Sequence, residues 1–169
     1  MWALSLALFG VAVWAWPDVP DQIPLHFGPD GQPGRWGERS WTAWMTLPLL
    51  GLALAAVLEG AATWARRHPE APALNLPNKR ALMNLPVDRR RPVLERLSEL
   101  LYATGGLSAG ALMAMQVGSW VSASGRDGSG WVLAGGLSLV IGSLAVMVWG
   151  MVRVEGEIRR QQGVLEAAA

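Results

Sequence analysis

Residues 131–152 read WVLAGGLSLVIGSLAVMVWGMV and contain no charged side chain. A helix needs roughly 20 apolar residues to cross a hydrocarbon core of about 30 Å. This stretch is therefore predicted to cross a membrane as a helix. The composition of the chain agrees, because 51% of its 169 residues are hydrophobic and only 16% are charged.

Three further apolar stretches lie toward the N-terminus. Residues 2–16 are uncharged but reach only about 22 Å as a helix; residues 41–65 carry one acid, Glu59, and residues 100–121 carry no charge. Tryptophan favours the headgroup level of a bilayer. Most tryptophans lie within a turn or two of a predicted boundary: Trp2, Trp14, Trp16, Trp41, Trp44, Trp64, Trp120, Trp131 and Trp149. The sequence predicts an all-α integral membrane protein with four transmembrane helices.

The first stretch also has the length of a secretory signal. It lacks a basic segment before its apolar part, and Trp14 and Trp16 flank Ala15 where a cleavage site would need small residues. We therefore expect residues 2–16 to be retained as the first helix.

Basic residues predict the orientation. Most of the Lys and Arg residues follow the second or fourth stretch, whereas Arg35, Arg39 and Arg126 are the only ones in the other connections. Because cytoplasmic loops carry the excess of Lys and Arg, residues 66–99, the tail 153–169 and both termini are predicted to be cytoplasmic. The loop 17–40 and the turn 122–130 are predicted to lie outside.

The inner loop has helical periodicity before the third span. Val87, Leu94, Leu97 and Leu101 recur at helical spacing, and basic side chains occupy the rest of the wheel. We expect an amphipathic helix that lies on the inner leaflet and then turns into the third span. Its arginines would attract anionic lipid at about 1 kcal/mol each, or would simply form a solvated face that fixes the topology.

Small residues predict helix packing. Gly106 and Gly110 are four apart in the third span, and Gly135, Gly142 and Gly150 recur in the fourth. Small residues let helix backbones approach closely in lipid. We expect these glycines to form packing surface, either within the chain or between copies.

Few groups in the chain suggest catalysis. It has no cysteine, so no thiolate can hold a metal. Glu59 is expected to pair with an arginine such as Arg66 at the membrane surface, and Gln116 to bond across helices. No phosphate-binding loop, nucleophile elbow or zinc-hydrolase motif occurs, and the basic residues near a membrane boundary do not resemble a nucleic-acid surface. We predict a non-enzyme without a cofactor.

The outer loop is rich in proline and glycine. Proline fixes φ and removes a donor, and glycine permits reversals, so the loop is predicted to be rigid and extended or turned. The residues concerned are Pro17, Pro20, Pro24, Pro29, Pro33, Gly28, Gly31, Gly34 and Gly37.

Two motifs resemble a known family. Residues 20–31, PDQIPLHFGPDG, resemble the P-D-x-I-P-x-H-x-x-x-x-G signature of an uncharacterised bacterial membrane-domain family that also forms the N-terminal part of SdpI-like immunity proteins. Residues 74–86, LNLPNKRALMNLP, are similar to an N-x-P-N-K segment of relatives, and the match covers Asn75, Pro77, Asn78 and Lys79. Relatives often carry an acid where this chain has Gly34 and a lysine where it has Arg39.

The resemblance implies a bacterial inner-membrane protein. SdpI-like proteins protect the producing cell from a membrane-active peptide toxin and pass the signal to a repressor held at the membrane. The outer site implied by the signature comprises Asp21, Ile23, Pro24, His26, Asp30, Gly31 and the nearby Trp36. His26 could ligate a metal with Asp21 and Asp30, or make a pH-sensitive contact. We favour a third interpretation, in which His26 bonds Asp21 or a backbone carbonyl and fixes the turns of the loop.

Three functions remain open at this stage. The first is a non-catalytic binding, immunity or sensing protein whose outer loop meets a peptide toxin or a membrane-protein partner, and whose inner segment meets anionic lipid or a cytoplasmic partner. The second is an accessory subunit that packs against a larger membrane complex. The third is an envelope enzyme that uses His26, for which no nucleophile or metal set is recognisable.

Overall fold

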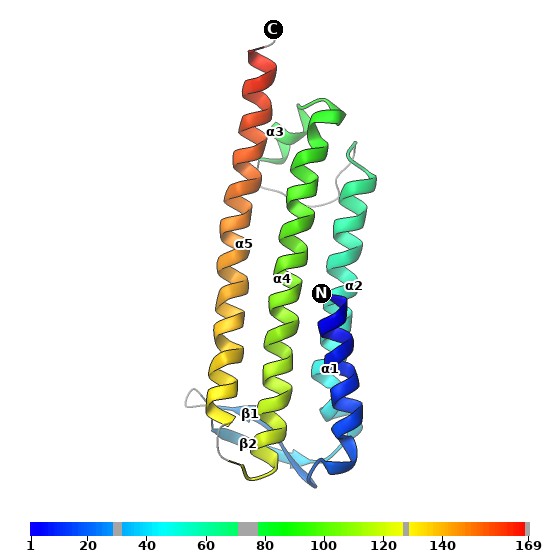
Figure 1. The fold of residues 1–169 in the computed structure, drawn as a ribbon, viewed down its shortest axis with the longest axis vertical. Helices are drawn as coiled ribbons and strands as arrows, with labels where there is room; N and C mark the ends of the chain where they lie inside the picture. Colours follow the sequence, from blue (N-terminus) through cyan, green and yellow to red (C-terminus); the bar gives the residue numbers. More distant parts are fainter. Residues whose placement is uncertain (29–31, 71–77, 127–128, 168–169) are drawn as a thin grey trace. The chain divides into compact units, whose positions relative to one another are not determined.

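The protein is mostly helical. A computed structural model describes residues 1–28, 32–70, 78–126 and 129–167. In chain order its elements are α1 (Trp2–Ala15), a 3-10 turn (Trp16–Asp18), β1 (Gln22–Phe27), β2 (Pro33–Glu38), α2 (Trp41–Arg67), α3 (Lys79–Met83), α4 (Val87–Ala123) and α5 (Ser129–Glu166) (Figure 1).

Within the described residues, three helices are long and apolar enough to cross a membrane: α2, α4 and α5. The membrane-protein prediction is thus supported for three of the four expected spans. Helix α1 has 14 residues and a length of about 21 Å, which is shorter than a hydrocarbon core.

The long helices expose apolar side chains. In α5 only 11% of the most apolar window is buried, and Leu144 and Val148 are 59% and 68% exposed. In water such a surface would be unfavourable by about 25 cal/mol per Å², whereas lipid removes this penalty. The exposure is therefore that of helices that face hydrocarbon.

The chain forms two compact units. The first comprises residues 1–55 and 105–143, and the second comprises residues 56–104 and 144–169. Helices α2, α4 and α5 contribute to both units, α1 and the two strands belong to the first, and α3 belongs to the second.

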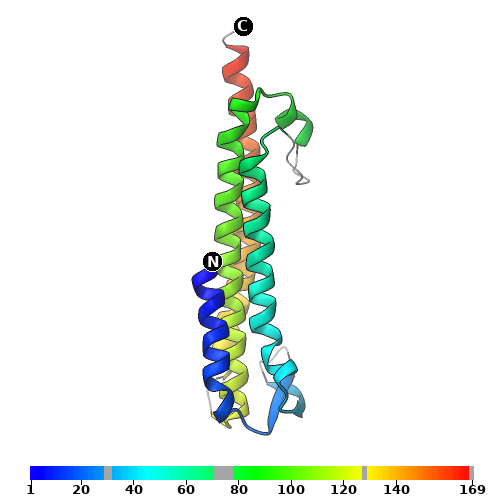
Figure 2. The same ribbon diagram turned by 90° about the vertical axis from the view of Figure 1, so that its right-hand side faces the viewer.

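In the first unit the outer loop forms an antiparallel hairpin, which we did not predict. Strand β1 pairs with β2 from Gln22 opposite Glu38 to Phe27 opposite Pro33, with register shifts after Pro24 and after His26. A two-stranded sheet has only edge strands, so prolines can occupy positions that need no ladder donor. The hairpin lies beside the first turns of α2 (Figure 2).

A small apolar cluster anchors the hairpin. It contains Val19 and Ile23 before and within β1, Trp44 and Met45 from α2, and Ala12 and Ala15 from α1. The indole Nε1 of Trp44 donates to the backbone oxygen of Ala12 at 2.8 Å. The hydroxyl of Ser5 likewise donates to the oxygen of Gly51 at 3.2 Å. These bonds join α1 to α2 without a charge.

In the second unit the predicted interfacial helix is part of α4. We expected a turn near Leu100, but α4 runs from Val87 to Ala123 without a break. Its stripe Val93, Leu94 and Leu97 packs in a core with Ala65 of α2, Leu82 and Leu85, and Val154 and Ile158 of α5. Of the apolar stripe that we had assigned to the leaflet, Leu94 and Leu97 are buried in this core and Leu101 packs against it, whereas Val87 is 44% exposed.

The predicted cytoplasmic tail is also helical. Helix α5 continues past Val152 to Glu166, because Val154 and Ile158 belong to the same core. Helices of 37 and 38 residues are about 55 Å long. Both are longer than a hydrocarbon core of about 30 Å is thick.

Two of the predicted packing glycines, Gly110 and Gly150, meet another helix. A Cβ at Gly110 would lie 3.4 Å from Leu139 and one at Gly150 would overlap Leu100, but at Gly106, Gly135 or Gly142 it would meet nothing within 4 Å. A close contact that we did not predict occurs at Gly136, where a Cβ would lie 3.2 Å from the Cβ of Ala114. The face of α5 that contacts α4 therefore includes Gly136 and not the neighbouring Gly135.

One arginine holds the connection between α2 and α4. Arg90 is 9% exposed. Its guanidinium donates to four backbone oxygens: Leu85 and Met83, both at 2.8 Å, Pro69 at 3.2 Å and Glu70 at 3.3 Å. The acceptors lie at or just beyond the ends of α2 and α3, where carbonyls have no intrahelical partner. Arg90 therefore satisfies carbonyls of two chain segments at once.

Replacing Arg90 with Met should destabilise the protein strongly. The substitution leaves several carbonyls unpaired, and each buried one costs about 1–3 kcal/mol, so we expect a loss of at least about 2 kcal/mol. The matched control is Arg91→Met, because Arg91 is exposed, and it should stay within about 0.5 kcal/mol. Equal melting temperatures for the two variants in detergent would contradict this role of Arg90.

Candidate functional site

The described part of the predicted outer site is spread over both strands of the hairpin. Ile23 is 3% exposed and Pro24 is buried, so both belong to the anchored side. Trp36 pairs with Pro24 across the ladder and is 44% exposed. Asp30 and Gly31 lie outside the described residues.

His26 does not fix the turns of the loop as we expected. It lies opposite Arg35 in the ladder, and its side chain is exposed. Among the described residues its ring makes no hydrogen bond, either to Asp21 or to a backbone carbonyl. Strand pairing holds the loop instead, which leaves the imidazole on the surface.

A metal site finds no support in the part of the chain that the structure describes. No group of three His, Cys, Asp or Glu side chains is close enough there to hold an ion. The third ligand considered from the sequence, Asp30, is outside that part. Asp21 contributes through its backbone, because its oxygen accepts the N–H of Arg39 at 2.8 Å.

Arg39 closes the base of the hairpin, a role that sequence analysis missed. Its Nη1 donates to the oxygen of Val19 at 2.7 Å, and its guanidinium carbon lies 4.9 Å from the ring centroid of Trp16. Trp16 stacks in turn on Trp41, with centroids 4.3 Å apart. A planar guanidinium can donate and stack at the same time. Arg39 thus contacts both the end of the 3-10 turn region, through Val19, and the ring of Trp16.

The hairpin presents a mixed surface. Leu25 and Trp36 are 45% and 44% exposed, and Arg35 and His26 are exposed beside them. Exposed aromatic and arginine side chains on a firmly held backbone are typical of the centres of protein interfaces. Strand pairing holds the backbone that carries these side chains.

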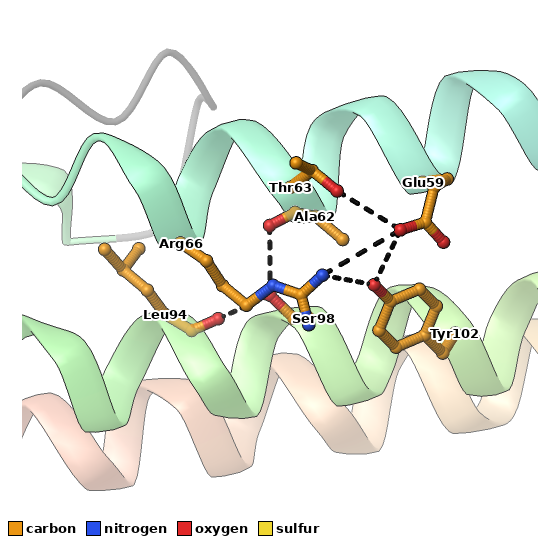
Figure 3. Close-up of polar contacts among 7 residues, drawn as sticks. All are labelled: Glu59, Ala62, Thr63, Arg66, Leu94, Ser98 and Tyr102. Atoms are coloured by element: carbon orange, nitrogen blue, oxygen red, sulfur yellow. Dashed lines mark hydrogen bonds and ion pairs between the residues drawn. The ribbon is translucent and has the colours of Figure 1, made fainter.

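A second polar cluster lies in the other unit (Figure 3). Oε1 of Glu59 accepts from the hydroxyls of Thr63 at 3.2 Å and Tyr102 at 3.1 Å, and it lies 3.8 Å from Nη2 of Arg66. Arg66 donates to the Tyr102 hydroxyl at 2.6 Å. The predicted pairing of Glu59 with arginine is confirmed. Sequence analysis missed Tyr102, the single tyrosine of the chain.

The inner motif is described only from Asn78 onward. Asn75 and Pro77 lie outside the described residues, and Lys79 is the first residue of α3. Asn78 has φ 54°, a left-handed conformation that asparagine tolerates better than most residues. Its Nδ2 donates to Oε1 of Glu155 at 2.8 Å, and the same oxygen accepts from Arg159 at 2.6 Å. The motif asparagine thus ties the start of α3 to α5.

Comparison with known proteins gives one match. A family model described as a domain of unknown function (DUF1648) matches residues 3–52. The match spans α1, the hairpin and the first part of α2, and all of it lies in the first unit. The resemblance of the N-terminal region to a family of unknown function is confirmed, whereas the relation to SdpI-like proteins remains a prediction. Neither a curated protein nor a solved structure matches the chain.

Replacing His26 with Ala should leave stability nearly unchanged. The ring is exposed and unbonded among the described residues, so the change should stay within about 0.5 kcal/mol. The comparison variant is Ile23→Ala on the same strand, which removes a side chain that is 3% exposed and should cost about 2–5 kcal/mol. Thermal melts of both, with elemental analysis of wild type and His26→Ala, measure this. A large loss for His26→Ala, or a metal lost with it, would contradict our assignment.

Proposed function

We propose that this chain is a small multi-pass protein of the bacterial cytoplasmic membrane with a non-catalytic role in binding. It is of the SdpI-like type and acts in immunity or in signal sensing at the cell envelope. Its hairpin recognises a peptide toxin or a membrane-protein partner. The observation that carries the proposal is the anchored hairpin, with Leu25 and Trp36 exposed on it.

The preformed structure of the hairpin favours a binding role for it over a role as a simple connection between α1 and α2. Ordering a flexible loop on association costs about 0.5–1.5 kcal/mol for each immobilised side chain. Here the ladder, the Ile23–Trp44 cluster and the Arg39 contacts order the backbone beforehand. A partner that meets the hairpin would therefore lose little of its interaction energy to ordering.

The proposed topology has four spans and cytoplasmic termini. Helix α1 exposes Leu4, Leu6 and Val13, as expected for a helix in contact with lipid. Its length requires local thinning of the bilayer or a contribution from the following 3-10 turn. The bias of Lys and Arg toward residues 66–99 and the tail supports the orientation.

On the inner side we propose contact with anionic lipid. The guanidinium carbon of Arg153 lies 4.2 Å from the ring centroid of Trp149, and Arg153 has no ion-pair partner among the described residues. Arg96 and Arg160 line the same groove as these two residues. An exposed cation beside an interfacial tryptophan matches the chemistry of a lipid phosphate.

One observation favours the accessory-subunit alternative. Helix α5 leaves most of its apolar window exposed, and Gly135 and Gly142 meet no side chain of the described chain. A helix of another protein could approach closely at these glycines. The enzyme alternative lacks such support, because His26 has no orienting partner among the described residues, as a general base would need.

The topology can be tested with single cysteines, because the natural chain has none. Glu38→Cys and Arg126→Cys should react with an impermeant maleimide in intact spheroplasts. Arg91→Cys, Val164→Cys and a cysteine added before Met1 should react only after permeabilisation. Labelling of the added N-terminal cysteine from outside would show that α1 does not cross, and labelling of Val164→Cys from outside would overturn the orientation.

Photo-crosslinking separates the binding role from the subunit role. A benzoylphenylalanine at Trp36 should give a discrete protein or peptide adduct in intact membranes, because the hairpin is the proposed recognition surface. The matched control replaces Trp131, which is also an exposed tryptophan at 85% exposure but lies on α5. A third probe replaces Val148 on the apolar face. An adduct from Val148 and none from Trp36 would reject the binding role in favour of a subunit.

A further inference from the structure

A groove lies between α4 and α5 in the second unit. One part of it has a volume of about 170 Å³ and includes Ala103 and Val146 in its wall. A second part has a volume of about 400 Å³ and includes Arg160. Trp149 and Arg153 line both parts, so the two are continuous.

The groove is apolar at one end and charged at the other. Ala103 and Val146, at the first end, belong to stretches of α4 and α5 that contain no charged residue. Arg153 and Arg160 follow the apolar stretch of α5, and Arg96 precedes that of α4. Because both helices are apolar enough to cross a membrane, the first end belongs to the hydrocarbon and the second to the membrane surface. A lipid has the same polarity along its length.

The charged end has an excess of one positive charge. Arg96 lies 3.5 Å from Glu99, and Arg160 lies 3.7 Å from Glu157. Arg153 has no ion-pair partner among the described residues. The wall thus holds three arginines and two glutamates, which leaves one positive charge for a ligand. An anion with a single negative charge would balance it.

Trp149 positions the unpaired guanidinium. The guanidinium carbon of Arg153 lies over the Trp149 ring, 4.2 Å from its centroid, and its N–H groups donate to no group of the described chain. A guanidinium carries its donors in a fixed planar fork that fits two oxygens of a phosphate. Trp149 is 59% exposed, and tryptophan favours the headgroup level. Arg153 therefore offers phosphate-binding donors at the level where lipid phosphates lie.

We propose that this groove binds one anionic phospholipid, whose single phosphodiester is held by Arg153 and whose acyl chain lies along Ala103 and Val146. The phosphodiester carries the one negative charge that the wall can balance. Its phosphate lies at the membrane surface and its chain points toward the bilayer centre, which is the direction in which the groove changes from charged to apolar. A soluble phosphate would leave the apolar end empty.

The inference rests on the proposed contact with anionic lipid and narrows it to one stoichiometric site. A general electrostatic contact needs only a basic surface, to which each exposed arginine contributes about 1 kcal/mol. A built site requires instead that Arg153 contribute more than other exposed arginines. The general contact can therefore hold while the site fails, and neither depends on the hairpin.

The test is native mass spectrometry of the full chain in detergent micelles. The protein is titrated with phosphatidylglycerol and, separately, with phosphatidylcholine that has the same acyl chains. We expect one phosphatidylglycerol to bind saturably. Phosphatidylcholine should bind at least about 5-fold more weakly, because its choline adds a positive charge close to the arginines. Glycerophosphoglycerol, the same head group without acyl chains, should not compete.

Variants with matched controls locate the site. Arg153→Gln should weaken phosphatidylglycerol binding about 10-fold or more, because hydrogen bonds to the charged phosphate are lost. Arg91→Gln removes the same charge from an exposed arginine of α4 outside the groove and should stay within about 2-fold. Ala103→Trp should weaken binding by filling the apolar end. Ala145→Trp, at an exposed position of α5 outside the wall, should not.

Each contrary result has a separate meaning. Equal binding of the two lipids by the wild type would overturn both the site and the proposed lipid contact. A preference for phosphatidylglycerol that Arg153→Gln and Arg91→Gln reduce equally, or binding that does not saturate at one lipid, would overturn the site alone. Competition by glycerophosphoglycerol would assign the groove to a soluble phosphodiester and overturn the lipid. Arg153 is exposed, so its variant keeps the test valid if melting shows that Ala103→Trp is unfolded.

Discussion

The guanidinium of Arg90 is the interaction on which the second unit depends. It gathers four backbone oxygens, from Pro69, Glu70, Met83 and Leu85, where two helices end. Such carbonyls have no partner within their own helices, and burial would leave them unsatisfied. A single planar cation with five donors meets this requirement and allows Leu82 and Leu85 to enter the core. The sequence suggests only that this arginine contributes to membrane orientation, whereas in the structure it holds the backbone of the second unit together.

The first unit satisfies its backbone in a related way. Arg39 donates to Val19 where the 3-10 turn gives way to the hairpin, and the indole of Trp44 donates to Ala12 in the last turn of α1. In both units a long side chain from a neighbouring element donates to backbone oxygens at the place where a helix or turn ends. The tryptophans therefore have two roles: Trp44 is buried and bonded, whereas Trp131 is 85% exposed, as an interfacial residue would be.

Much of the fold follows from apolar runs that can be read along the sequence. The start of α2 at Trp41 and the helices over residues 100–121 and 131–152 were predicted because composition alone determines them. The hairpin, the unbroken α4 and the helical tail were not, since each depends on contacts between distant segments, such as Ile23 with Trp44 or Leu94 with Val154. The candidate site was predicted less well. The motif led to His26, but strand pairing leaves its ring exposed, and Arg39 and Tyr102 carry no local signal that distinguishes them from other polar residues.

The contact of Leu100 with Gly150 has a mechanical consequence. A Cβ at Gly150 would overlap the Leu100 side chain, so the leucine occupies a notch that the missing side chain of Gly150 leaves open. The residues one turn away on the same face of α5, Val146 and Val154, carry side chains on either side of this notch along the helix axis. Sliding of α4 along α5 by one turn would require the Leu100 side chain to pass one of these valine side chains. In the second unit the two helices are therefore fixed in their relative axial position, and an axial displacement of one helix would also displace the other.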